Sequence, residues 1–432
     1  MQKSVKRTQT YLGLALIIIL LGFGYYLSGL KAILPLHLLA GVSFGYALTR
    51  SRYGFAGGVK RLYMRGEASL SKALLLLFAF TSFVFAGIQW KAASQGALPA
   101  FVEGAGDFII PGTQNVEFVN LATIVGGFLF GVGMIMVGCC ASGTLSDLGE
   151  GRVRALISLI FFVLSAAPGQ AARAVFDRTA LGQVGFRLHL PQVFGYFGAL
   201  VITLALLAGL WWWVMNYEKK RKEDKTSLDP YGDWEEIEKP LDLSTPAPLF
   251  SYATYHKLFI ERWTFFTGTV IIALTAVFVL VTAGSPWGVT SPFVTWDVAL
   301  LQNFGLEFSK ANFASYLEKV NRGLLVDGPT IRNIGLFAGS LLAFLLANRF
   351  RIRSGFSIRD GIYYAIGGTL LGFGSRLALG CNIGALYSAI SSFSISGWFF
   401  LFATIAGGVV GLKLFQGKIN IIPIPIQCER ER

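Results

Sequence analysis

Residues 126–145 read GGFLFGVGMIMVGCCASGTL, and residues 367–386 read GGTLLGFGSRLALGCNIGAL. Aligned without a gap at an offset of 241, the two stretches share eight of twenty residues. The first stretch contributes Gly126, Gly127, Leu129, Gly131, Gly133, Cys140, Gly143 and Leu145. Because five identities precede a shared cysteine, the match indicates an internal duplication rather than a coincidence of glycines. Such duplications are typical of transporter folds, whose binding sites lie where the repeats meet.

The composition of the chain is that of a membrane protein. Of its 432 residues, 54% are hydrophobic, only 14% are charged and 51 are glycine. A soluble domain has about a quarter charged residues, so most of this chain must be buried in lipid or in its own core. This excludes disordered, collagen-like and disulfide-stapled proteins. The four cysteines include an adjacent pair, which excludes a CxxC redox or zinc-ribbon motif.

Ten apolar segments approach the ~20 residues that a helix needs to cross a bilayer. They are 11–29, 32–49, 73–90, 119–138, 155–168, 193–216, 263–283, 332–348, 361–379 and 397–415. Segment 155–168 is short and is expected to extend to one side. Ten crossings would place both termini on the same side of the membrane.

The distribution of lysine and arginine predicts which side that is. A net charge of +13 would suit nucleic-acid binding only if a soluble face carried it. Here the basic residues gather in 50–72, 219–225 and 349–359, all on the side of the basic N-terminus. Cytoplasmic loops carry the excess of lysine and arginine. We therefore expect both termini in the cytoplasm and no nucleic-acid partner.

One polar segment divides the apolar chain. Residues 217–262 mix charges of both signs with four prolines and show no sustained apolar period. This predicts a first membrane half (1–216), a cytoplasmic linker (217–262), a second membrane half (263–419) and a polar tail (420–432). The predicted fold is an all-α integral membrane protein with two pseudo-symmetric repeats of transmembrane helices. In this topology the first motif is approached from outside and the second from inside, so the repeats would be inverted.

Glycine is dense in both motifs, and it has two explanations. Small residues let transmembrane helices pack closely, which suits Gly126, Gly127 and Gly131. The runs GCCASG (138–143) and GCNIG (380–384) are poor helix interiors, because each glycine costs about 1 kcal/mol relative to alanine. Irregular backbone survives at membrane depth only where it is buried or lines a cavity. We predict broken or half-length helices that meet at the centre, with an anion site at the restarted N-termini.

Cys140 and Cys381 stand at equivalent points of the two repeats. A lone cysteine among apolar residues is usually an inert small hydrophobe, but two at matched positions favour a function. A thiol is a weak donor and a polarizable acceptor, which suits sulfur or selenium atoms. Cys139 corresponds to Gly380, so it is either a packing variant or a second pathway thiol. Cys428 lies in the polar tail and is interpreted as a bystander.

Other polar groups near the breaks complete the predicted pathway. Arg376 lies five positions before Cys381, and a charge within a span usually faces a cavity or a partner. It either attracts an anion or pairs with a carboxylate such as Glu150. Asn382 and Ser142 can donate to an oxyanion. The full predicted set is Cys139, Cys140, Ser142, Gly143, Arg376, Cys381, Asn382 and Gly384.

No sequence pattern points to catalysis or to a metal. His37, His189 and His256 are scattered without metal-ligand spacing. No P-loop, Rossmann fingerprint or nucleophile elbow is present. We predict no cofactor, no metal ion and no catalytic residue.

Three stretches resemble one known family. GVGMIMVGCCASGTLSDLGEGR (131–152) resembles the first signature of the YeeE/YedE family of sulfur-transport proteins. GFGSRLALGCNIGALYSAISSFSISGWFF (372–400) resembles the second signature, and RSRYGFAGGVKR (50–61) is similar to a third, N-terminal element. The resemblance covers both membrane halves and leaves out 217–262 and 284–331.

The resemblance implies a specific function. The best understood members take up thiosulfate through a two-fold pseudosymmetric body with half-length helices and a central line of cysteines, onto which Cys140 and Cys381 map. Two departures leave the substrate open. Thiosulfate-importing members often carry a cysteine within the N-terminal element, where this chain has Gly54 after Tyr53. In addition, Cys139 replaces the glycine that usually precedes the loop cysteine.

We therefore interpret the chain as a multi-pass transporter of a prokaryotic inner membrane. It would take up a small sulfur-containing anion, thiosulfate before others, without a covalent step. One alternative is a transporter of a selenium species or another sulfur compound. Another is a membrane-embedded sulfur-transfer or redox enzyme in which Cys140 forms a persulfide, although no acid–base partner is evident. The expected partners are the anion, the lipid bilayer and a cytoplasmic sulfur-carrier protein.

Overall fold

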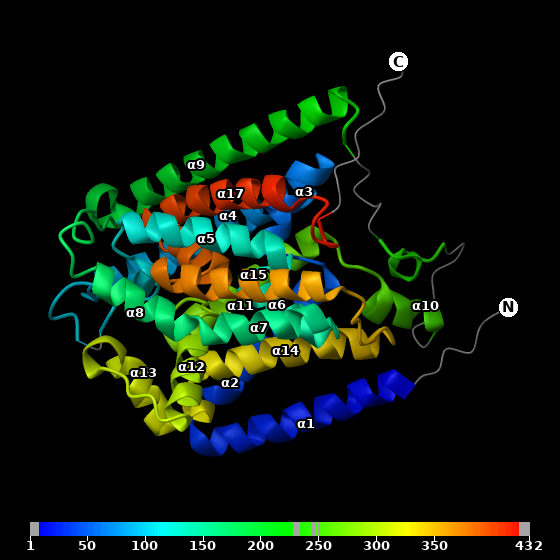
Figure 1. Cartoon of the computed structure of the whole chain (residues 1–432), viewed down its shortest axis with the longest axis horizontal. Coiled ribbons are helices and arrows are strands. Elements are labelled where there is room, and N and C mark those ends of the chain that lie inside the picture. Colours follow the sequence, from blue (N-terminus) through cyan, green and yellow to red (C-terminus); the bar gives the residue numbers. More distant parts are fainter. Residues whose placement is uncertain (1–7, 107, 228–233, 243–247, 249–250, 423–432) are drawn as a thin grey trace.

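The helices of this protein lie side by side in a bundle (Figure 1). The computed structural model describes residues 8–106, 108–227, 234–242, 248 and 251–422. Within these residues the secondary structure is helical, and the only strand-like pairings are isolated bridges. The predicted all-α class is confirmed.

The elements follow the predicted apolar segments. Those before the linker are α1 (Thr8–Leu30), α2 (Leu34–Arg50), α3 (Phe55–Arg65), α4 (Ser69–Ser94), η1 (Thr113–Asn115), α5 (Leu121–Val137), α6 (Ala141–Gly149), α7 (Val153–Leu164), α8 (Ala166–Phe176) and α9 (Leu190–Glu223). Those that follow are η2 (Glu236–Glu238), α10 (Tyr252–Tyr255), η3 (His256–Ile260), α11 (Phe265–Ala283), α12 (Ser291–Asn303), α13 (Lys310–Arg322), η4 (Leu324–Val326), α14 (Gly328–Leu346), α15 (Ile358–Leu377), η5 (Asn382–Ser388), α16 (Ala389–Ser391) and α17 (Ser396–Phe415).

Eight helical segments in the described part of the chain are long and apolar enough to cross a membrane. They are Thr8–Leu30, Ser69–Ser94, Leu121–Gly149, Val153–Phe176, Leu190–Glu223, Phe265–Ala283, Gly328–Leu346 and Ser396–Phe415. The other two predicted spans fold as α2, which has only 17 residues, and α15, which carries three charged residues. The multi-pass class is therefore confirmed, while the count of ten crossings stays a prediction.

The short segment 155–168 extends as predicted. α7 and α8 follow each other across Ser165, and together they form a 24-residue segment, Val153–Phe176. A helix of that length spans ~36 Å at 1.5 Å per residue, which exceeds the hydrocarbon core.

Different segments of the chain lie at the two ends of the bundle. α3 and α10 lie at one end of the molecule, and α13 lies at the opposite end (Figure 1). This agrees with the predicted placement of 50–72 and the linker on one side and of 284–331 on the other. Which of the two sides is cytoplasmic stays a prediction.

Glycines bring the central helices into backbone contact. A Cβ at Gly126 would lie 2.7 Å from the carbonyl oxygen of Gly374, and one at Gly133 would lie 2.6 Å from that of Gly367. Real Cβ atoms do not approach so closely, so α5 and α15 can cross only because all four residues lack side chains. The close-packing explanation of the motif glycines is confirmed. Gly131 plays the same part between α5 and α17, since a Cβ there would clash with the carbonyl oxygen of Thr404, and Gly127 leaves room for the Ala403 side chain.

We expect Gly133→Ala to destabilise the folded protein by about 1–3 kcal/mol, because the added methyl overpacks a backbone contact. Gly209→Ala is the matched control, since a Cβ at this position on α9 meets nothing within 4 Å. There the better helix propensity of alanine should leave stability unchanged or raise it by up to ~1 kcal/mol. Thermal unfolding of the purified variants measures both. Equal melting temperatures for the two variants would contradict the packing argument.

Candidate functional site

The chain leaves helical geometry where the first motif predicts. α5 ends at Val137, and Gly138 follows with a φ of 85°, which glycine adopts without steric penalty. Cys140 is then the N-cap of α6, with an extended backbone at φ −90° and ψ −172°. The predicted break at 138–143 is present, and the helix restarts at Ala141.

The second motif breaks in the same way. α15 ends at Leu377, and Leu379 has a φ of 60°, a left-handed conformation that is costly for a residue other than glycine. Cys381 is the N-cap of the π-helix η5, with φ −111° and ψ −169°. The backbone N–H of Ile383 donates to the Cys381 Sγ at 3.5 Å. Cys140 and Cys381 therefore occupy equivalent positions in the two repeats and have the same extended backbone conformation.

The thiols are buried and have hydroxyl partners. Cys140 and Cys381 are 1% and 0% exposed and belong to the same hydrophobic cluster. The Cys140 Sγ is 3.3 Å from the Ser142 Oγ, and the Cys139 Sγ is 3.4 Å from the Thr144 Oγ1. The structure thus brings together Cys139, Cys140 and Ser142, and it places Cys381 in the same hydrophobic cluster as Cys139 and Cys140.

A cavity of about 660 Å³, open to the surface, reaches the first break. Part of its wall is the break itself, from Gly138 to Gly143. Most of the charged lining is cationic, and it consists of Arg52, Lys60, Arg61, Arg65, Arg152, Arg154 and Arg262 against Asp147, Glu150 and Glu235. A cleft lined mainly by one sign of charge concentrates ions of the opposite sign. This charged cavity therefore attracts anions toward Cys139 and Cys140.

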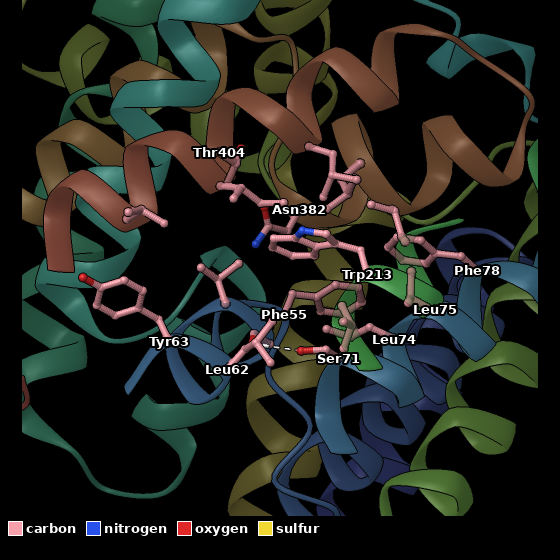
Figure 2. A pocket seen from close by; sticks show the side chains of 18 of the residues that line it. Phe55, Leu62, Tyr63, Ser71, Leu74, Leu75, Phe78, Trp213, Asn382 and Thr404 are labelled. Carbon is pink, nitrogen blue, oxygen red and sulfur yellow. Dashed lines mark hydrogen bonds between the residues drawn. The ribbon is translucent and has the colours of Figure 1, made fainter. Parts of the chain in front are cut away.

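The short helix α3 separates the charged cavity from an apolar pocket of about 340 Å³ (Figure 2). Phe55, Leu62 and Tyr63 line the apolar pocket, whereas Gly57 and Lys60 line the charged cavity. The sequence FAGGVKRLYMR places these two kinds of residue on opposite faces of a helix. The N-terminal element of the family resemblance is therefore one wall of the candidate site.

Two predicted pathway residues lie beside the second break. Asn382 lines the apolar pocket (Figure 2), and its Nδ2 donates to the Met134 Sδ at 3.2 Å. The carbonyl oxygen of Gly384 accepts from the Asn115 Nδ2 at 2.9 Å. Asn115 comes from the loop before α5, and nothing in its sequence surroundings indicated this contact.

Arg376 contacts neutral side chains and not the suggested carboxylate, while its attraction of an anion stays a prediction. Its Nη2 donates to the Gln170 Oε1 at 2.7 Å and to the Tyr316 hydroxyl at 2.9 Å. The suggested pairing with Glu150 is wrong, because Glu150 pairs with Arg52 and Arg152 at 2.9 Å each. The reason is topological: α15 carries Arg376 at its C-terminal end, next to Gln170 of α8 and Tyr316 of α13, whereas Glu150 lies beside Arg52 and Arg152.

Sequence reasoning missed an aromatic cluster beside the second break. The Tyr387 ring of η5 lies 6.0 Å from Phe55, 5.6 Å from Phe78 and 6.3 Å from Trp287 between centroids. Trp287 in turn stacks on Phe44 at 3.7 Å. Tyr387 follows Cys381 by six residues, so the motif contained a signal. Its partners come from distant segments that no local pattern connects.

These features define a class. The chain is a multi-pass helical membrane protein in which two helices restart at matched cysteines, one of them at the inner wall of a cationic cavity. Among the described residues no group of three histidine, cysteine or acidic side chains is arranged to hold a metal ion. The sequence profile of the sulphur-transport family matches residues 50–410, and the chain belongs to that family.

Individual relatives carry more specific names. The chain is similar to the thiosulfate transporter TsuA of Escherichia coli K12, with 26% identity over 377 residues, 86% of this chain and 91% of the relative. It is similar to TsuA of Spirochaeta thermophila, with 22% identity over 367 residues, 84% and 92% of the two chains. The probable transporter YedE of E. coli K12 is 31% identical over 173 residues, 40% and 43% of the two chains. The resemblance to the YeeE/YedE family is confirmed.

The cavity's charge predicts which thiol reagents reach the first break. An anionic methanethiosulfonate should modify Cys139 and Cys140 about tenfold faster than a cationic reagent of the same size. Raising the ionic strength should reduce this preference, because salt screens charges lining an open cavity. Intact-protein and peptide mass spectrometry of the Cys381→Ser variant would measure both rates. A faster reaction with the cationic reagent would contradict the anion-attracting character of the cavity.

Proposed function

We propose that this protein imports thiosulfate into the cytoplasm of a prokaryotic cell, through a pathway that includes Cys140 and Cys381. The observation that carries the proposal is the matched pair of cysteines, each the N-cap of a restarted helix. Membership of the sulphur-transport family, and the thiosulfate transporters among the relatives, support the choice of substrate.

An inverted repeat accounts for the packing of the central helices. At the offset of 241, Gly126 corresponds to Gly367 and Gly133 corresponds to Gly374. The observed contacts join Gly126 to Gly374 and Gly133 to Gly367, so the repeat operation exchanges one contact for the other. A two-fold axis has this property. The helices run antiparallel at these contacts, which favours an axis in the membrane plane, as in inverted-repeat transporters.

The pathway works without covalent chemistry. A helix N-terminus offers free backbone N–H groups and the positive end of its dipole to an anion. Two such ends, at Cys140 and Cys381, replace part of the hydration shell of the anion, and the thiols contact its terminal sulfur. The hydroxyls beside Cys139 and Cys140 are poor general bases, and Asp147 and Glu150 in the same cavity are held in ion pairs with arginines, which favours transport over sulfur transfer.

Cys139 supplies the thiol that the N-terminal element lacks. Gly54, where related importers often carry cysteine, lines the charged cavity, and Cys139 lines the same cavity. The extra cysteine at position 139 and the missing cysteine at position 54 thus belong to two walls of the same cavity. In this arrangement the anion meets Cys139 and Cys140 on the side of α3 and Cys381 on the far side of the first break.

Removing either matched thiol should abolish uptake. We expect Cys140→Ala and Cys381→Ala to reduce thiosulfate uptake to background while the proteins stay folded. The serine variants should also fail if polarizable sulfur matters, and should work if any small donor suffices. Growth of a sulfur-assimilation mutant on thiosulfate alone, together with uptake into vesicles, measures the effect. Cys428→Ala, at a position outside the described residues, is the control and should be silent. Full uptake by the Cys140→Ala/Cys381→Ala protein would refute the pathway.

Transport also predicts unmodified thiols after turnover. A sulfur transferase must pass through a persulfide, which adds one sulfur atom to the protein. After incubation with thiosulfate, the intact-protein mass should be unchanged, and intact thiosulfate should be found inside the vesicles. An added sulfur on Cys140 or Cys381 that a second thiol removes would favour the enzyme alternative.

A further inference from the structure

An acidic segment of the linker contributes to the wall of the charged cavity. Residues 234–238 read WEEIE. The Glu235 side chain lines the cavity, and the Glu238 side chain is buried, with 4% exposure. The carbonyl oxygen of Glu238 accepts the backbone N–H of Arg262 at 3.0 Å, which ties the segment to the start of the second half.

Arginines from both membrane halves hold the two carboxylates. Arg52, which follows α2, lies 3.1 Å from Glu238, and Arg349, which follows α14, lies 2.7 Å from Glu235 and also pairs with Glu238. Both guanidinium groups stand over the ring of Phe344, at 5.2 and 5.4 Å from its centroid. Because this stacking involves no linker residue, the membrane halves themselves position the two arginines.

The charges continue inward as one network of ion pairs. It contains the five arginines Arg52, Arg152, Arg154, Arg349 and Arg353 and the four carboxylates Asp147, Glu150, Glu235 and Glu238. Its inner end, Arg154 with Asp147 at 2.6 Å, belongs to the cavity wall near Cys139. Two of the four carboxylates come from the linker. If the linker left, five guanidinium groups would face only two carboxylates.

Glu238 is a charged ligand of this site at neutral pH. Burial by itself would raise the pKa of its carboxyl group, but the nearby Arg52 and Arg349 outweigh this effect and hold the pKa below its ordinary value. Removing a carboxylate from partly buried arginines leaves their charge uncompensated, which is strongly unfavourable. The site therefore needs an anion whenever the linker carboxylates are absent.

We propose that Arg52 and Arg349 form an anion-binding site next to the charged cavity, which Glu235 and Glu238 occupy as an internal ligand until a transported anion displaces them. Arginine binds carboxylates and other oxyanions through the same forked N–H geometry, so a small dianionic oxyanion such as thiosulfate fits the site. Residues 234–238 then act as a lid that opens when the anion arrives from Cys139. The direction of transport in this inference rests on the proposed function.

Hydrogen–deuterium exchange of the unmodified protein tests the lid. In nanodiscs, thiosulfate should accelerate exchange of the peptide that contains 234–239 and of the Arg262 amide. Chloride at equal ionic strength should have little effect. We expect an acceleration of about tenfold, since thiosulfate competes with the two carboxylates for the same arginines and shifts the segment toward its open state. Unchanged exchange in thiosulfate would overturn the proposal without the use of any variant.

Matched variants separate the lid from a general charge effect. Glu235→Gln/Glu238→Gln should exchange fast without thiosulfate and show no further response. Glu236→Gln is the control on the same turn, because Glu236 is 87% exposed and pairs with Lys239 at the surface. It should behave like the unmodified protein, and a response like that of the double variant would overturn the proposal.

An uptake assay distinguishes failure of the lid from failure of the proposed function. Exchange that responds to thiosulfate in a protein that transports none would refute the proposed function and keep the anion site. Uptake with unchanged exchange would refute the lid alone. If lid opening limits release, the Glu235→Gln/Glu238→Gln protein should also take up thiosulfate severalfold faster than the Glu236→Gln control.

Discussion

A helix that ends inside a bilayer leaves backbone N–H groups that lipid cannot satisfy, so such an end must be enclosed by protein or lie at a water-filled cavity. The arrangement of this protein follows from that requirement. The restarted helices α6 and η5 begin at Cys140 and Cys381, and both cysteines are buried among other helices. The same N–H groups that are costly in lipid are favourable toward an anion. In the proposed pathway, the enclosure of the helix ends and the binding of the anion therefore have one physical origin.

Glycine makes this enclosure possible. Buried breaks need close neighbours, and the central helices approach until their backbones touch at Gly126, Gly133, Gly367 and Gly374. No residue with a Cβ would allow this distance. The glycines of the repeat thus serve two purposes. The four glycines at the helix crossing allow close packing, and Gly138 permits the left-handed turn that ends α5.

Charge is arranged around the breaks in an ordered way. The thiols lie in an apolar cluster, the cationic cavity reaches Cys139 and Cys140, and the linker carboxylate of Glu235 lines the same cavity. An anion moving along this line would pass from dipoles and thiols to guanidinium groups. The buried arginines are paired with carboxylates, which offsets the desolvation cost of their charges. α3 maintains the separation, since its apolar face and its basic face look into different cavities.

The sequence by itself determined the helical membrane class, the repeat, the two breaks and the matched cysteines. Each of these depends on local pattern: apolar length, glycine spacing and the offset of 241. Only the tertiary structure decided the rest. Arg376 turned toward Gln170 and Tyr316, Asn115 reached Gly384, and Glu238 bridged Arg52 and Arg349. Arg52 and Glu238 are 186 positions apart in the chain. Which residues become partners depends on how the helices pack, and no periodic pattern along the chain indicates that packing.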